Sequence, residues 1–385
     1  MGVTSVEECQ FLNISGDKTE KCQGGYDYWV VKLTENFNLI EGKAFADLNS
    51  NNLQDTGEPA LKGITLAESY TGSLGFANQK GNFDVVVMDS GNFTVAPLLL
   101  LHYSIVPASH NAYFPSMQLT DSLNDFAFQP TGVINDLAIN ITPTSPFRPG
   151  FNAHYNLHYR NIGTTSLTDT IIFYPDPQIT FVSSSVTPSI IAADSIMWQT
   201  SLLNPFDAGD ILVTVNVNQG TPIGTLVNSS AKIEPVPGDA TPVNNYAWWE
   251  VFVTGSFDPN DILVNRAAIT TTELLSPPYI EYIIRFQNTG TDTAFNAKLL
   301  NPLDTAKLQL NTFELMSASH PVNITWKAWE RNMEFQFNNI LLPDSNINEP
   351  MSHGFVRYRI KQNQRLPQVI QLEITLSFIL TLTIL

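Results

Sequence analysis

Short runs of β-forming residues, separated by turn residues, follow one another along almost the whole chain, and this pattern constrains the fold more than any other feature. Clear examples are Phe83–Met88, Ala153–Tyr159, Ile211–Val217 and Tyr279–Phe286. Gly, Pro, Asn and Asp lie between such runs, and no stretch combines helical periodicity with capping residues. Strands that recur at short intervals in this way are typical of β-sandwiches. We therefore predict an all-β protein made of β-sandwiches in tandem.

A pattern that occurs twice sets the size of two of these sandwiches. Tyr155-x-x-x-Tyr159-x-Asn161-x-Gly163-Thr164 recurs as Tyr282-x-x-x-Phe286-x-Asn288-x-Gly290-Thr291. Each copy spans about a hundred residues or slightly more, the size of one immunoglobulin-like sandwich. The Asn-x-Gly-Thr part indicates a tight turn at the end of a strand, in which Gly supplies a positive φ. The repeat predicts two immunoglobulin-like domains, one after the other.

Residues 47–58 have the spacing of oxygen ligands found in an EF-hand calcium loop. A hard divalent cation prefers six or more oxygens, and short polar side chains at alternate residues converge on one point. The predicted ligands are Asp47, Asn49, Asn51, Asp55 and Glu58 through their side chains and Leu53 through its backbone carbonyl. The flanking segments are typical of strands, which indicates an isolated calcium loop on a β scaffold. The alternative is an Asx-rich turn that holds no metal.

One position of this loop departs from the calcium pattern. Asn52 stands at the sixth position, where EF-hand loops carry Gly. Asn adopts a left-handed backbone more readily than most residues do, so we expect the departure to be mild.

Composition narrows the classes of partner and compartment. The chain has 385 residues with 43% apolar residues, enough for folded cores, and a formal net charge of −17, which argues against nucleic acid or an anionic membrane as partner. Cys9 and Cys22 could close a short disulfide, but no Cys/His set indicates zinc. Residues 1–24 are polar and lack the apolar region of a secretory signal, and the apolar stretch 378–385 is too short to span a membrane.

Several polar clusters have a functional and a structural interpretation. His154, Asn156 and His158 share one strand face, which indicates either a metal site or an interdomain strand face. His320 and His353 each follow a Ser, but no Gly-x-Ser-x-Gly turn accompanies them, so we interpret both as structural. The sequence offers no catalytic constellation.

The segment Gly255–Asp261 is interpreted as a junction between domains. Asp258 and Asp261 lie in it, and the acidic and amide residues Asp239, Asn244 and Asn245 precede it. Such a junction could hold a second calcium ion or could be a Pro-containing linker with Asx turns. The paired carboxylates would suit glycoside hydrolysis, but a linker gives neither the burial nor the pKa tuning that this reaction needs.

Several tryptophans could belong either to a binding site or to a hydrophobic core. Trp248 and Trp249, together with Tyr246, could form a platform for sugars, or they could pack in a strand-borne core. Trp326 and Trp329 have the same two interpretations.

Three stretches resemble a module of large Bacteroidetes surface proteins that the type IX system secretes: Gly255–Asp261, Tyr282–Phe295 and Leu341–Phe355. Asp136–Val253 is similar to a related repeat domain of bacterial surface proteins. Gly42–Phe128 resembles the calcium-binding B-type repeat of adhesins, a prealbumin-like sandwich. Gly24–Leu33 is similar to the closing strand of a propeller-type repeat. The resemblance implies a fragment of a longer secreted protein.

After Ile360 the sequence departs from the pattern of that module. We expect the last sandwich to lack its final strand and to expose a sheet edge there.

These observations divide the chain into five parts. They are residues 1–39, a remnant of a propeller-type repeat; 40–130, a prealbumin-like repeat with the calcium loop; 133–255 and 256–365, two immunoglobulin-like domains; and 366–385, an aberrant apolar tail. We expect a non-catalytic structural or adhesive module at the cell surface, stiffened by Ca²⁺. Its ligand would be a polysaccharide or another surface protein, with no nucleic acid and no insertion into membranes. The alternative is a carbohydrate-binding accessory region of an exported hydrolase.

Overall fold

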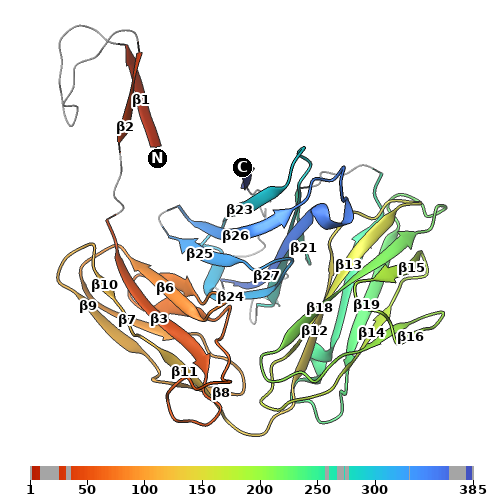
Figure 1. Ribbon diagram of the computed structural model, residues 1–385, viewed down its shortest axis with the longest axis horizontal. Helices are drawn as coiled ribbons and strands as arrows, with labels where there is room; N and C mark the ends of the chain where they lie inside the picture. The colour runs from red at the N-terminus through yellow and green to blue at the C-terminus, as the bar shows by residue number, and fades with distance from the viewer. Residues whose placement is uncertain are drawn as a thin grey trace.

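The computed structural model describes residues 2–8, 26–31, 36–255, 260–266, 273, 277–328, 330–363 and 379–383. Their regular structure is nearly all strand, with short 3₁₀ segments such as η1 (Pro242–Asn245) and η3 (Pro350–Ser352). The strands form three β-sandwiches and one separate hairpin (Figure 1). The predicted all-β fold of tandem sandwiches is confirmed.

The hairpin consists of β1 (Gly2–Glu8) and β2 (Tyr26–Val31), which pair antiparallel. Figure 1 shows it extending away from the sandwiches. Cys9 and Cys22, for which the sequence suggested a disulfide, lie outside the described residues.

The first sandwich packs two sheets around a core rich in Phe and Val. One sheet has the order β10-β3-β11-β8, with β6 also paired to β3, and the other has the order β5-β4-β7-β9. In β7, Phe93 and Val95 are buried while their neighbours are more exposed, the alternation of a strand with one face in the core. The strands are β3 (Asn38–Ala46), β4 (Thr65–Glu68), β5 (Leu74–Phe76), β6 (Asn82–Val87), β7 (Gly91–Pro97), β8 (Tyr103–Val106), β9 (His110–Phe114), β10 (Thr120–Asp121) and β11 (Phe126–Pro130).

The second sandwich joins sheets of order β12-β13-β18-β15 and β16-β17-β14-β19-β20. Its largest fully buried side chains include Trp198, Tyr155 and Phe173. The strands are β12 (Leu137–Pro143), β13 (Asn152–Asn161), β14 (Thr170–Tyr174), β15 (Ile179–Ser184), β16 (Ile190–Ile191), β17 (Ile196–Gln199), β18 (Ala208–Val217), β19 (Leu226–Glu234) and β20 (Tyr246–Phe252).

The third sandwich repeats the topology of the second. Its sheets have the orders β21-β22-β27-β24 and β25-β26-β23-β28. Counted from β12 and from β21 as strand 1, both domains have one sheet of order 1-2-7-4 and another that contains 5-6-3-8. The strands are β21 (Asp261–Val264), β22 (Tyr279–Gln287), β23 (Ala294–Pro302), β24 (Leu308–Ala318), β25 (Asn323–Lys327), β26 (Asn332–Leu342), β27 (His353–Gln362) and β28 (Ile379–Thr383).

Strand β28 differs from what the sequence led us to expect. Residues 379–383 belong to the apolar tail, and they pair antiparallel with β23, from Leu300↔Ile379 to Asn296↔Thr383. The tail therefore covers the β23 edge that we expected to be left open. The sequence here alternates Leu and Thr, which suits a strand.

The repeated Asn-x-Gly-Thr motif makes the same turn in both domains. Asn161 accepts a hydrogen bond from the Gly163 amide at 3.0 Å, and Asn288 accepts one from the Gly290 amide at 3.1 Å. The prediction of a positive φ was wrong, because neither glycine lies in the left-handed region. Gly163 is needed for space instead, since a Cβ there would lie 2.5 Å from the backbone oxygen of Ile134.

Each sandwich touches the other two. Phe76 of the first packs edge-on against Phe313 of the third, with ring centroids 5.3 Å apart. Tyr103 of the first packs against Phe206 of the second at 4.7 Å. Ile283 of the third is buried with the core of the second. Figure 1 shows the third sandwich, in blue, seated between the other two. The three domains therefore form a closed ring, in which each domain contacts both of the others, and are not only joined end to end.

Candidate functional site

The Asp47–Glu58 loop begins directly after β3 and is closed at its base. The Ala46 amide donates to the Pro59 carbonyl at 2.9 Å, and the Asp47 amide donates to the Phe128 carbonyl at 2.9 Å. Asp47 has no exposed surface. The base of the loop is therefore fixed to two strands, while most of the loop is exposed.

The backbone of the loop turns sharply at three residues with a positive φ. Asn52 has a φ of 64°, so it takes the left-handed conformation that we expected at the sixth position. Ser50, with a φ of 60°, and Gly57, with a φ of 98°, add further sharp turns.

The carboxylates of the loop point inward and accept hydrogen bonds from within it. Asp47 accepts from the amides of Asn51 at 3.0 Å and Asn52 at 2.8 Å, and from Gln129 Nε2 at 2.7 Å. Glu58 accepts from the Asp55 amide at 2.9 Å. Burial alone would raise the pKa of Asp47, but the hydrogen bonds from Gln129 and the backbone together hold this pKa below its usual value. The loop keeps Asp47 ionised.

The side chains at the predicted ligand positions converge. Asp55 Oδ2 accepts hydrogen bonds from Asn49 Nδ2 at 2.8 Å and from Asn51 Nδ2 at 2.7 Å. These amide groups place partial positive charge against the carboxylate, as a cation would. When Asn49 and Asn51 turn their side-chain carbonyl oxygens toward the centre of the loop, all the metal ligands are oxygen atoms, which suits calcium. Among the described residues, no group of three or more His, Cys, Asp or Glu has the arrangement of a metal site, so binding here would also need amide and backbone oxygens.

In the interdomain junction that could hold a second calcium ion, Asp261 contacts an arginine instead. Asp258 lies outside the described residues. Asp261 accepts a hydrogen bond from Arg285 Nε at 2.7 Å and pairs with Arg285 Nη2 as well. Arg285 Nη1 in turn donates to the Ser145 carbonyl of the second sandwich at 3.0 Å. Asp261 therefore orients an arginine that joins two domains.

On the strand face with His154, Asn156 and His158, His158 lines the cleft where the three sandwiches meet, and His154 lies near Glu349 and His353 of the third sandwich. His158 Nδ1 lies 2.9 Å from Asp210 Oδ1, and Asn156 Nδ2 donates to the same oxygen at 2.7 Å. His154 is buried, and burial lowers its pKa. The hydrogen bonds of His158 and Asn156 therefore stay within the second sandwich.

The two histidines that follow a serine, His320 and His353, make local contacts. His353 Nε2 lies 3.0 Å from Glu349 Oε1. His320 Nδ1 lies 2.9 Å from Ser319 Oγ, and that oxygen also accepts the Phe355 amide at 3.0 Å. Burial lowers the pKa of His320. Ser319 joins two strands through its hydroxyl and is not placed on a strained, exposed turn.

The tryptophans divide between core and surface. Trp249 is 7% exposed and Trp326 is 5% exposed, so both are core residues. Trp248 is 63% exposed and Tyr246 is 53% exposed, because alternate residues of β20 point to opposite faces. Trp329 lies outside the described residues.

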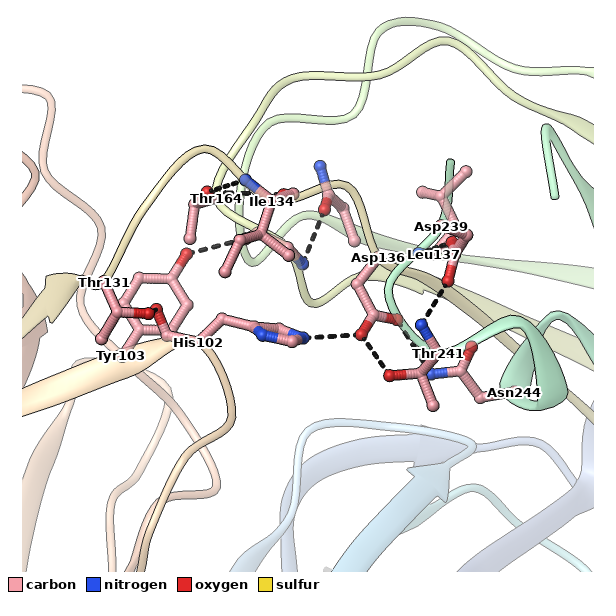
Figure 2. Close-up of polar contacts among 12 residues, drawn as sticks. His102, Tyr103, Thr131, Ile134, Asp136, Leu137, Thr164, Asp239, Thr241 and Asn244 are labelled. Atoms are coloured by element: carbon pink, nitrogen blue, oxygen red, sulfur yellow. Dashed lines mark hydrogen bonds and ion pairs between the residues drawn. The ribbon is translucent and has the colours of Figure 1, made fainter. Parts of the chain in front are cut away.

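A buried carboxylate, Asp136, joins the first and second sandwiches, and sequence reasoning missed it (Figure 2). His102 Nε2 of the first sandwich lies 2.7 Å from Asp136 Oδ2, and Thr241 Oγ1 donates to the same oxygen at 2.8 Å. Asn244 Nδ2 donates to Asp136 Oδ1 at 2.9 Å. The sequence did single out Asn244 as part of a polar cluster, but we interpreted that cluster as either a second calcium site or a linker with Asx turns.

Asp239, the acidic member of that cluster, accepts hydrogen bonds within the second sandwich. Its carboxylate accepts the backbone amides of Leu137 and Thr241, each at 2.8 Å. Nearby, the Tyr103 hydroxyl donates to the Gly163 carbonyl at 2.7 Å (Figure 2). The contacts that cross between the two domains here are therefore those of Asp136 with His102 and of Tyr103 with Gly163.

Where the three sandwiches meet, they enclose a cleft of about 1450 Å³. An ion-pair network crosses it: Glu314 Oε1 lies 3.1 Å from Arg160 Nη2, and Glu314 Oε2 lies 2.6 Å from Arg359 Nη2. Burial would raise the pKa of Glu314, but the two guanidinium groups hold this pKa below its usual range. The network joins the second sandwich to the third.

The described residues include no helix with the length and apolarity needed to cross a bilayer.

Solved structures with partial similarity share little sequence with this chain. The CARDB domain of a Pyrococcus furiosus protein, in complex with di-metal ions, is 18% identical over 33% of this chain and 99% of that chain, with a TM-score of 0.24. Native alpha-2-macroglobulin from Escherichia coli, spanning domain MG7 to the C-terminus, is 13% identical. The match covers 45% of this chain and 24% of that chain, with a TM-score of 0.23. A DUF3823 family protein from Parabacteroides merdae is 10% identical. The match covers 57% of this chain and 100% of that chain, with a TM-score of 0.19.

No curated protein matches the chain. Residues 258–377, which include β21 to β27 of the third sandwich, match the domain of unknown function DUF7619.

Proposed function

We propose that this chain is a non-catalytic structural and adhesive module of a secreted surface protein, stiffened by calcium at the Asp47–Glu58 loop. The observation that carries the proposal is the ring of contacts among the three sandwiches. Joined end to end only, such domains would flex at their linkers. Joined pairwise, they act as one rigid body that holds a binding surface in a fixed shape.

Polar groups support this rigidity at two of the three joints. Asp136 holds the first sandwich to the second. Arg357 Nη1 of the third donates to the Ile141 carbonyl at 2.7 Å and to Thr142 Oγ1 at 3.0 Å in the second. The same guanidinium lies 4.8 Å from the centroid of the Trp249 ring. Because these groups are desolvated, separating the domains would leave them without partners, at a cost of about 1–3 kcal/mol each.

The oxygen donors of the loop support the calcium part of the proposal. Asp47, Asn49, Asn51, Asp55 and Glu58, with the Leu53 carbonyl, would hold the ion. Calcium would supply a positive charge to the carboxylates and amide oxygens of the loop and would tie the loop together. Because only the folded loop presents these ligands at once, calcium would stabilise the fold by about 2.7 kcal/mol at a hundredfold excess over its Kd.

The proposed location of the protein at the cell surface rests on the net charge of the chain and on the DUF7619 match. The net charge of −17 suits a calcium-rich, extracellular setting. The DUF7619 match at residues 258–377 falls on the segment that resembles the module of type IX-secreted proteins. We therefore place the chain in an exported protein of that kind. Turnover of an esterase, protease or glycosidase substrate would contradict the non-catalytic part of the proposal.

Thermal melts with calcium, with magnesium and with excess chelator test the calcium part. We expect calcium to raise the Tm by several degrees, whereas magnesium should have little effect because it demands a smaller and more regular ligand set. Glu58→Ala should abolish the calcium-dependent rise. Since this change also removes hydrogen bonds to the Leu48 and Asp55 amides, the Tm difference between calcium and chelator is the decisive quantity.

Glu250→Ala is the matched control, because it removes an exposed glutamate away from the loop. It should keep the full calcium response. An equal Tm with calcium and with chelator in the parent protein would show that the loop is an Asx-rich turn.

A further inference from the structure

The cleft between the three sandwiches is larger than a small-molecule site. Its volume of about 1450 Å³ exceeds the roughly 300–1,000 Å³ of typical ligand pockets. All three domains contribute to its walls, among them Leu61 of the first sandwich, Trp248 of the second and Arg359 of the third. A site of this size suits a segment of a polymer.

Strand β20 presents aromatic side chains to this cleft. Tyr246, Trp248 and Phe252 lie on one face of the strand and are 53%, 63% and 62% exposed. Tyr246 and Trp248 are two residues apart, which places them about 7 Å from each other along the strand. Trp249 points the opposite way and is buried in the core of the second sandwich and against Arg357 of the third. The core residue anchors the strand while its neighbours remain open, so the aromatic face is preformed.

Polar groups accompany these rings across the neighbouring strand. In β19, Ser230 pairs with Trp248 and Asn228 pairs with Glu250. Lys232 lies with its Nζ 5.4 Å from the centroid of the Tyr246 ring. Aromatic faces flanked by hydroxyl, amide and carboxylate groups suit a ligand with apolar C–H faces and many hydroxyls.

Most of the charged groups that line the cleft pair with one another. Arg160 and Arg359 share Glu314, and His158 lies against Asp210. These pairs neutralise much of the charge on the walls of the cleft. The whole chain carries a net charge of −17, which would repel a polyanion. Both facts favour a neutral ligand over a charged one.

We propose that the β20 face of the cleft binds a neutral polysaccharide chain, whose sugar rings stack on Trp248 and Tyr246. This deepens the adhesive function proposed above and rests on it, by assigning the ligand class and the surface. A peptide that added a strand to the β20 edge would bind through the backbone. It would therefore depend little on the aromatic side chains.

Affinity electrophoresis of the full chain tests the assignment. The gels would contain mannan, xylan or a soluble β-glucan, with alginate as the acidic comparison. We expect at least one neutral polysaccharide to retard the protein and alginate to leave it unretarded. Trp248→Ala should weaken the binding by roughly fivefold or more, and Tyr246→Ala by less, since a stacked aromatic contributes about 1 kcal/mol.

Tyr113→Ala is the matched control, because Tyr113 is 63% exposed on β9 of the first sandwich and is absent from the cleft lining. It should bind like the parent, and an unchanged Tm would show that each variant is folded. Three results would overturn the proposal: retardation by none of the neutral polysaccharides, equal binding by Trp248→Ala and the parent, or retardation by alginate alone. None of them bears on the calcium melts, so the two proposals fail separately.

Discussion

At the scale of single residues, the polar groups with the largest structural effect join domains. Asp136 is fully buried and has three side-chain partners, from His102, Thr241 and Asn244 (Figure 2). A buried carboxylate with all its partners in place is stable, but its partners become unsatisfied when it is removed. The strength of the joint is therefore concentrated in one side chain.

Asp136→Ala should lower the stability of the protein by at least about 2 kcal/mol, because it leaves buried donors without an acceptor. Differential scanning calorimetry would measure the fall in Tm. Asp194→Ala, which removes an exposed carboxylate of the second sandwich, should change the Tm little. Similar Tm values for the two variants would contradict the role that we assign to Asp136.

At the scale of elements, the third sandwich is completed by a strand from the far end of the chain. β28 pairs with β23, and its place in the sheet is that of β19 in the second sandwich. Without β28, β23 would be an edge strand with unpaired backbone groups, the kind of edge that promotes aggregation.

Thr381→Pro should weaken this pairing, since proline fixes φ at about −65°, away from the φ of an antiparallel strand. We expect a loss of about 1–3 kcal/mol, which corresponds to a Tm lower by a few degrees, together with increased light scattering on heating. Thr381→Val keeps a β-branched side chain at the same position and should behave like the parent. If Thr381→Pro and Thr381→Val melt alike, β28 does not complete the sheet.

At the scale of the whole molecule, ion pairs help to hold the ring closed. Glu314 of the third sandwich bridges Arg160 of the second and Arg359 of its own domain. Its pKa is lower in the folded protein than in an unfolded chain. Such a group contributes stability above its unfolded pKa and loses that contribution as the pH falls through its folded pKa.

Acidification below about pH 4 should therefore loosen the contact between the second and third sandwiches. Small-angle X-ray scattering would detect a larger radius of gyration at low pH than at pH 7. Glu314→Gln should already be expanded at pH 7 and should change less on acidification. Glu250→Gln, an exposed control, should follow the parent. A parent protein with the same radius at both pH values would contradict this view of the ring.

The sequence by itself determined the β class, the repeated domain and the coiled backbone of the Asp47–Glu58 loop. These features depend on local rules: side chains alternate along strands, and Asn and Gly favour turns. The left-handed Asn52 and the matching turns at Asn161 and Asn288 follow from such rules.

Only the tertiary structure decided how the domains pack and which residues face the cleft. Arg357 reaches the Ile141 carbonyl across 216 residues of sequence, and no local pattern encodes a contact of that range. The alternation in β20 places Trp248 and Trp249 on opposite faces, but which face is open depends on the other sheet and the other domains. Burial is a property of the assembled fold, so the sequence could name the tryptophans without assigning their roles.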